Sequence, residues 1–168
     1  RNDFDQASAY FKKLKKQNQP GSVQNLLSTS LNSWVNFKNV NNLNSALIFL
    51  ERIPKKFKNL KKIQKTFAHC YFDSNQTDQE FKKLTLNTDI NFSRYLFFHA
   101  NYLISKNKEK KMIKTIDSSV NLYPQNLILK QLKIDQKQKK IFNNQFDCKE
   151  IKHVIAEIFY IVANSLAT

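Results

Sequence analysis

The 168-residue chain contains a single glycine, Gly21. Phosphate-cradling loops, the dinucleotide-binding fingerprint and the nucleophile elbow of hydrolases each need several positions with positive φ or close backbone approach, which glycine supplies. One glycine therefore excludes these enzyme sites. Long apolar runs are also missing, because the most apolar stretch, residues 154–163, contains Glu157 and is shorter than the roughly 18 to 20 residues that span a bilayer. We expect no membrane span.

Cysteine and histidine are also scarce, with two and three residues. Cys70 and Cys148 lie far apart in the sequence, and neither belongs to a Cys-x-x-Cys motif. This spacing favours neither a disulfide framework nor a zinc site, so we expect two buried free thiols. His153 and Glu157 can share a helix face, but two ligands do not complete a metal site. No spacing of acids, bases or nucleophiles indicates catalysis, so we expect no enzyme activity, cofactor or metal.

Negative charge is under-represented: 28 Lys and Arg stand against 13 Asp and Glu, for a net charge of +15. Such a surface attracts anionic partners. Only three of the basic residues are arginine, whose planar guanidinium is best suited to phosphate and base recognition. We interpret the lysine clusters as solvated surface, with the phosphate-tracking stripe of an RNA-binding protein as the alternative. The clustered lysines are Lys12, Lys13, Lys15, Lys16, Lys55, Lys56, Lys58, Lys61 and Lys62.

What the chain does contain is one amphipathic helix after another. Apolar residues recur at spacings of three and four, residues suited to N-caps precede these runs, and Pro20, Pro54 and Pro124 mark helix ends. No segment reads as a convincing strand. The expected helices cover residues 3–17, 22–38, 42–52, 56–71, 76–84, 92–105, 108–122, 125–136 and 149–167.

The helices also repeat. In the second helix of each expected hairpin, a small or medium residue is followed four and seven positions later by mostly bulky or apolar residues. These triads start at Ala7, Ala46, Thr77 and Met112, which are 39, 31 and 35 residues apart. Positions i, i+4 and i+7 lie on one helix face, so the pattern predicts stacked hairpins that share an apolar seam.

In these features the chain resembles the tetratricopeptide repeat family, in a degenerate form similar to bacterial multi-repeat proteins. The likeness is carried by residues 2–7 running to Phe11, Leu14 and Pro20, by Lys106 and Asn107 running through Met112 and Ile116 to Pro124, and by residues 156–163. The resemblance implies an all-α, right-handed superhelical solenoid of antiparallel helical hairpins.

On this interpretation the chain has three parts. Residues 1–136 form helical repeats with a truncated first repeat, residues 137–148 form a linker, and residues 149–168 form the first helix of a following repeat block. We therefore expect a fragment of a longer protein, whose final helix lacks a neighbour to cover it. We also expect the native N-terminus to be missing, which leaves the compartment open between bacterial cytoplasm and periplasm.

The resemblance further implies a non-enzymatic scaffold that binds a peptide or helix of a partner protein in the concave groove formed by the first helices. An asparagine amide in such a groove can donate to and accept from a peptide backbone at once, and an arginine can hold a carboxylate. The expected groove residues are Asn25, Ser28, Asn32, Asn36, Arg94, Asn101, Tyr160 and Asn164. The alternative function is that of a basic helical-repeat RNA-binding protein. The partner, the oligomeric state and the total number of repeats are open.

Overall fold

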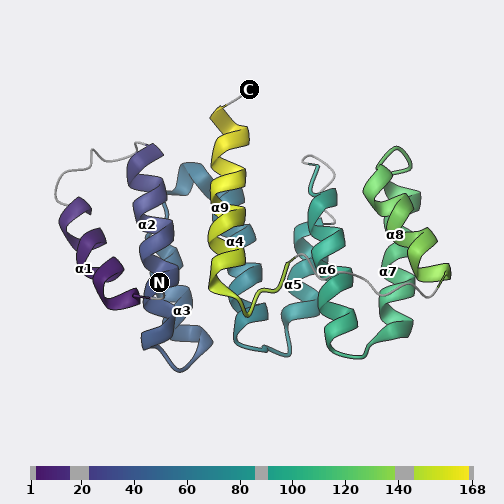
Figure 1. The fold of residues 1–168 in the computed structure, drawn as a ribbon, viewed down its shortest axis with the longest axis horizontal. Coiled ribbons are helices and arrows are strands. Elements are labelled where there is room, and N and C mark those ends of the chain that lie inside the picture. The colour runs from purple at the N-terminus through teal and green to yellow at the C-terminus, as the bar shows by residue number, and fades with distance from the viewer. Residues whose placement is uncertain (1–2, 16–22, 86–90, 139–145, 167–168) are drawn as a thin grey trace. The chain divides into compact units, whose positions relative to one another are not determined.

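The computed structural model describes residues 3–15, 23–85, 91–138 and 146–166. This part of the chain is helical and contains no strand, which confirms the predicted all-α class (Figure 1). The helices are α1 (Phe4–Lys15), α2 (Val23–Asn36), α3 (Leu43–Glu51), α4 (Lys58–Tyr71), α5 (Thr77–Thr85), α6 (Ser93–Ser105), α7 (Glu109–Leu122), α8 (Leu127–Lys137) and α9 (Ile151–Leu166), with 3-10 helices η1 (Phe37–Asn39) and η2 (Lys55–Phe57). None of the described helices combines the length and apolarity needed to cross a bilayer.

Side-chain caps and left-handed residues set several of the helix ends. Asn42 accepts a hydrogen bond from the Ser45 N–H at 2.9 Å and starts α3, and Asn126 starts α8 in the same way. At the ends of α4 and α6, Asp73 and Asn107 adopt φ values of 52° and 54°. Each is the left-handed residue that satisfies the last carbonyl groups of its helix. The two caps lie 34 residues apart in the sequence.

The chain divides into two compact units. Unit 1 comprises residues 1–74 and 148–168 and contains α1 to α4 together with α9. Unit 2 comprises residues 75–147 and contains α5 to α8. Unit 1 is thus built from two segments that the whole of unit 2 separates in sequence. Most of the linker predicted at residues 137–148 lies outside the described residues.

The core of unit 1 lies where α2 and α4 pack around aromatic side chains. Trp34 and Phe37 are completely buried, with ring centroids 4.4 Å apart, and Phe67 of α4 is buried with them. The Trp34 indole donates to Gln64 Oε1 at 3.0 Å, and Gln64 Nε2 donates to Ser30 Oγ at 3.1 Å. Both polar atoms of the buried Gln64 amide therefore have a hydrogen-bond partner on α2.

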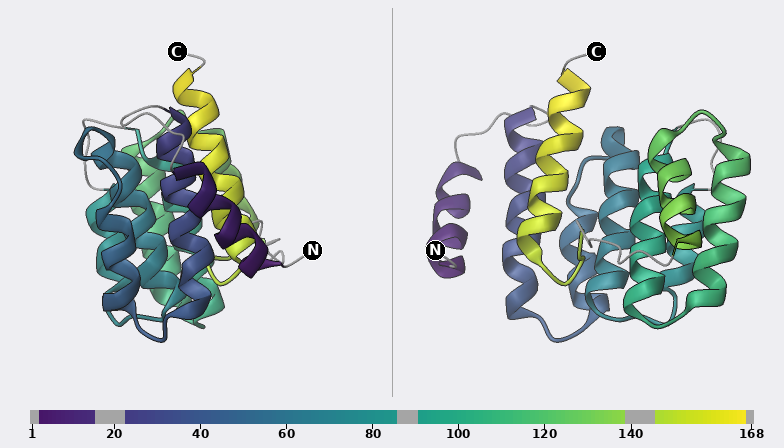
Figure 2. Two further views of the ribbon diagram at one scale, coloured as in Figure 1. Left: turned by 90° about the vertical axis from the view of Figure 1, so that its left-hand side faces the viewer. Right: turned by 45° about the vertical axis from the view of Figure 1, so that its right-hand side comes forward.

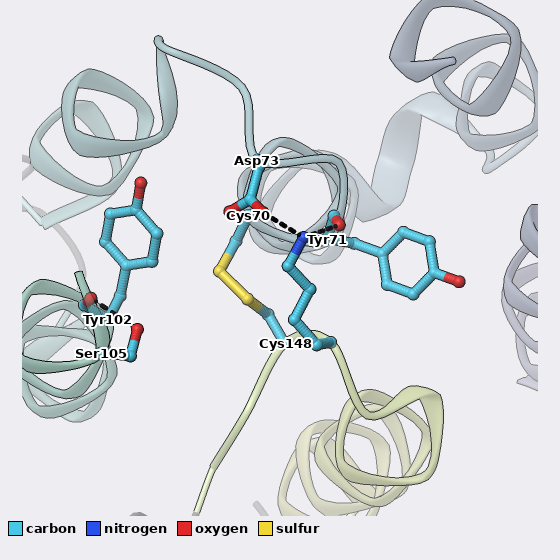
Figure 3. Close-up of a disulfide and its surroundings, with 7 residues drawn as sticks. Cys70, Tyr71, Asp73, Tyr102, Ser105 and Cys148 are labelled. Atoms are coloured by element: carbon cyan, nitrogen blue, oxygen red, sulfur yellow. Dashed lines mark hydrogen bonds and ion pairs between the residues drawn. A yellow bond between two sulfur atoms is a disulfide. The ribbon is translucent and has the colours of Figure 1, made fainter. Parts of the chain in front are cut away.

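The cysteines form a disulfide in unit 1, so the expectation of two free thiols is wrong (Figure 3). Cys70 lies at the end of α4 and Cys148 just before α9, with their Cα atoms 5.9 Å apart. Lys149 adds an ion pair to Asp73 at 2.7 Å and donates to the Tyr71 carbonyl at 2.6 Å. The pairing was missed because 78 residues separate the two cysteines, and only the packing of α9 onto α4 brings them together.

The final helix does have neighbours. Helix α9 packs on α2 and α4, and it lies alongside α2 in both Figure 1 and Figure 2. Its buried apolar residues form one stripe at i, i+3, i+7 and i+11, namely Ile151, Val154, Ile158 and Val162. The expectation that this helix lacks a covering neighbour is therefore wrong. Its opposite face is exposed and includes Phe159 and Tyr160.

Unit 2 is organised around α6, which packs on α5, α7 and α8. Its apolar core is formed by Ala100, Leu103, Met112, Ile116 and Leu132. Two ring stacks extend this core: Phe81 lies on His99 with centroids 5.0 Å apart, and Phe98 lies on Phe146 with centroids 4.0 Å apart. Helix α6 is therefore the most enclosed helix of the unit, and its polar residues need partners within the protein.

Candidate functional site

Four of the predicted groove residues form one stripe along α2. Asn25, Ser28, Asn32 and Asn36 follow at i, i+3, i+7 and i+11. Ser28 is buried and donates to the Asn25 carbonyl at 3.1 Å. Asn36 Nδ2 donates to Asn32 at both its carbonyl, 2.7 Å away, and its Oδ1, 3.0 Å away. Part of the hydrogen-bonding capacity of this stripe is thus used within α2.

Two further groove residues, Tyr160 and Asn164, lie on α9. Both are exposed, and Asn164 Nδ2 donates to the Tyr160 carbonyl at 2.9 Å. Tyr160 and its neighbour Phe159 leave 48% and 50% of their surface exposed, which is unusual for two consecutive aromatic residues. Six of the eight predicted residues therefore belong to two neighbouring helices of unit 1.

The remaining two predicted residues, Arg94 and Asn101, lie on α6 of unit 2. Arg94 is exposed, and its guanidinium lies 5.0 Å from the centroid of the Phe98 ring. This cation–π contact occupies one face of the guanidinium group that was expected to bind a carboxylate. Whether the eight residues line a single groove stays a prediction.

Asn101 is the exceptional residue of the set. It is 3% exposed, and neither its Nδ2 nor its Oδ1 has a hydrogen-bond partner within the described part of the chain. One turn before it lie Phe97 and Phe98, and one turn after it Ile104, so apolar side chains flank it along the helix. A buried polar group without a partner costs about 1–3 kcal/mol. The amide can donate two hydrogen bonds and accept two.

Gln64 provides the comparison within the same chain. It is a completely buried amide in unit 1, and it both accepts from Trp34 and donates to Ser30. The protein can therefore bury an amide and satisfy it. Asn101 departs from this pattern, which marks it as a candidate contact for a ligand.

Sequence reasoning missed a partly buried pair in unit 2. His99 Nε2 lies 2.8 Å from Asp78 Oδ1, and the Asp78 carboxylate also contacts Lys82 at 3.1 Å and Lys111 at 3.6 Å. Burial raises the pKa of Asp78, but hydrogen bonds from Lys82 and His99 outweigh it and hold the pKa at about 2. Burial lowers the pKa of His99 against the opposing effect of Asp78.

The contact between His99 and Asp78 joins α6 to α5. The two residues are 21 positions apart on different helices, so no sequence motif could have indicated the pair. In the described part of the chain, no three His, Cys, Asp or Glu side chains lie close enough to hold a metal ion. The pair therefore links two helices of the unit 2 core.

The lysines show no single pattern. Lys61 and Lys65 both pair with Glu51, which lowers the pKa of that carboxyl. The other lysines around the start of α4 are exposed, and so are two on α1: Lys55, Lys56, Lys58, Lys62, Lys12 and Lys13. The side chains of Lys15 and Lys16 lie outside the described residues.

Comparison with protein-family models, with curated proteins and with solved structures yields no match.

Proposed function

We propose that this chain is a protein-binding scaffold of the tetratricopeptide repeat type, which holds a peptide or helix of a partner protein against the first helices of its hairpins. Helices α2, α4, α6 and α8 begin at residues 23, 58, 93 and 127, at separations of 35, 35 and 34 residues. The left-handed caps at Asp73 and Asn107 repeat with the same period. This regularity supports a right-handed solenoid of stacked hairpins.

The observation that carries the binding function is the Asn101 amide, which is buried on α6 and has no hydrogen-bond partner among the described residues. An extended peptide backbone offers a carbonyl and an N–H side by side, which is the pair that a primary amide complements. We expect a partner segment to supply these bonds as the side chains over Asn101 move aside. Each bond made in a site shielded from water contributes to affinity and to the register of the bound segment.

A peptide-display selection on the immobilised full chain tests this function. Selected peptides would be titrated calorimetrically against the wild-type protein, Asn101→Leu and the matched control Asn39→Leu, which changes an exposed asparagine of η1. We expect peptides whose affinity falls at least tenfold, about 1.4 kcal/mol, with Asn101→Leu and stays unchanged with Asn39→Leu. The function is wrong if no selected peptide distinguishes the two variants.

The alternative function, binding of RNA by a basic helical repeat, is favoured by the net charge of +15 and by the exposed lysines around η2 and the start of α4. A polycation that contacts only phosphates loses affinity steeply as salt rises. Gel-shift titrations of single-stranded RNA at about 50 and 200 mM salt separate the two functions. Tight, sequence-dependent binding at the higher salt concentration would favour RNA recognition over protein binding.

A further inference from the structure

Helix α9 lies on unit 1 in the way that a bound helix would. It contacts α2 and α4, which are the first helices of the predicted hairpins (Figures 1 and 2). It buries the stripe Ile151, Val154, Ile158 and Val162. Val154 and Ile158 are completely buried. The whole of unit 2 separates α9 from α4 in the sequence. Its packing is therefore a long-range association between two segments rather than the closing of a local hairpin.

The covalent attachment of α9 is confined to its beginning. Cys148 is bonded to Cys70 (Figure 3). Lys149 is paired with Asp73, and both Cys148 and Lys149 lie immediately before the helix starts at Ile151. Beyond this point, α9 packs on α2 and α4 and buries the aliphatic stripe together with the Glu157 side chain. The disulfide thus fixes the base of the helix and keeps the remainder at a high local concentration over its binding face.

We propose that the face of α2 and α4 under α9 is a binding site for an amphipathic helix of a partner protein, that α9 is its intramolecular occupant, and that the Cys70–Cys148 bridge keeps α9 in place. This inference rests on the proposed function and specifies its partner. The ligand is a helix with apolar residues at i, i+3, i+7 and i+11, the pattern by which helices bind in grooves.

Opening of the site requires reduction of the bridge by a dithiol. One thiolate of the reductant attacks a bridge sulfur, a mixed disulfide forms, and the second thiol displaces the protein cysteine. The S–S bond breaks, two electrons and two protons pass to Cys70 and Cys148, and the reductant becomes a disulfide. The two cysteines are 1% and 5% exposed, so attack is slow while α9 stays docked.

The test is binding of a fluorescent peptide with the sequence of residues 149–166 to the full chain, followed by anisotropy. The protein would be compared in the bridged form, after reduction by a dithiol, and as Cys148→Ser. Ala156→Ser, at an exposed position of α9, is the matched substitution that leaves the bridge closed. The control peptide carries Ile158→Glu, which places a charge in the buried stripe.

We expect the peptide to bind the reduced protein and Cys148→Ser at least tenfold more tightly than the bridged wild type and Ala156→Ser. The control peptide should bind none of them. Equal affinity for bridged and open protein would refute the role of the disulfide. Absence of binding to the open protein, with helical content retained by circular dichroism, would refute the helix-binding face.

Hydrogen exchange of the reduced wild type covers the case in which Cys148→Ser does not fold. Reduction should accelerate exchange in residues 151–166 at least tenfold more than in α2 and α4, and uniform acceleration would count against a detachable α9. Failure of this inference can also be distinguished from failure of the proposed function, because Asn101 lies in unit 2. Peptides that depend on Asn101 would still bind if only the α9 inference fails.

Discussion

Replacing Asn101 by leucine should stabilise the free protein, whereas replacing a buried polar residue usually destabilises a fold. The Asn101 amide is 3% exposed and its two polar atoms have no partner among the described residues. Removing such a group recovers about 1–3 kcal/mol. The fit of leucine in place of asparagine costs about 1 kcal/mol. We therefore expect the free energy of unfolding to rise by up to about 2 kcal/mol.

Gln64→Met is the counterpart, a change of similar size at an amide whose hydrogen bonds are made. It removes two hydrogen bonds and leaves the indole N–H of Trp34 buried without a partner. The loss should be about 2–4 kcal/mol. The two substitutions are thus expected to change stability in opposite directions, although both replace a buried amide by an apolar side chain.

Urea denaturation measures both changes. Trp34 is the only tryptophan of the chain and lies in unit 1, so its fluorescence reports on the unit that contains Gln64, while far-UV circular dichroism follows all helices. Asn164→Leu, an exposed asparagine of α9, is the control and should change stability by less than about 0.5 kcal/mol. A loss of stability above about 1 kcal/mol in Asn101→Leu would show that its amide is satisfied after all.

Three other measurements follow from the structure. Reduction of the Cys70–Cys148 bridge, which spans 78 residues, should lower the unfolding free energy by up to about 4.5 kcal/mol, and a urea midpoint that is unchanged by a dithiol would contradict this. Burial lowers the pKa of His99 in the folded state, so its contribution to the free energy of unfolding should be fully present above the ordinary pKa of 6.5 and be lost as the pH falls below that value. His99→Gln should flatten this pH dependence between pH 7.5 and 5. An unchanged pH profile would show that another group causes the dependence. Asn42→Ala removes the cap of α3 and should lower the free energy of unfolding by about 1 kcal/mol. Asn41→Ala changes the exposed residue beside the cap and should leave the free energy of unfolding almost unchanged. Equal shifts in melting temperature for the two variants would exclude a capping role.

Local signals predicted most of the secondary structure. The helix expected over residues 42–52 begins at its predicted cap, Asn42, and the one expected over residues 92–105 agrees with α6 to within one residue. Both follow from caps and apolar periodicity, which act over a few residues. No comparable local signal marks the 3-10 helices, and the helix predicted from residue 56 covers part of η2.

Contacts between residues that are distant in the sequence could not be predicted. Cys70 and Cys148 meet because α9 packs on α4, and His99 meets Asp78 because α5 packs on α6. No spacing rule connects residues on different helices. Asn101 is one of five asparagines in the predicted groove, and only the structure distinguishes it, because burial and hydrogen bonding depend on the complete set of neighbours.

The bridge between Cys70 and Cys148 turns residues 70–148 into a covalent ring from which two tails emerge, one towards each terminus. A protease that cuts the backbone once anywhere inside this ring leaves every residue attached to the same molecule. Such a nicked chain migrates as one species on a denaturing gel and separates into two fragments only after reduction. A single backbone cut in α5, α6, α7 or α8 therefore does not release α9. The helix that covers α2 and α4 stays attached through the disulfide even after the chain between α4 and α9 has been cut.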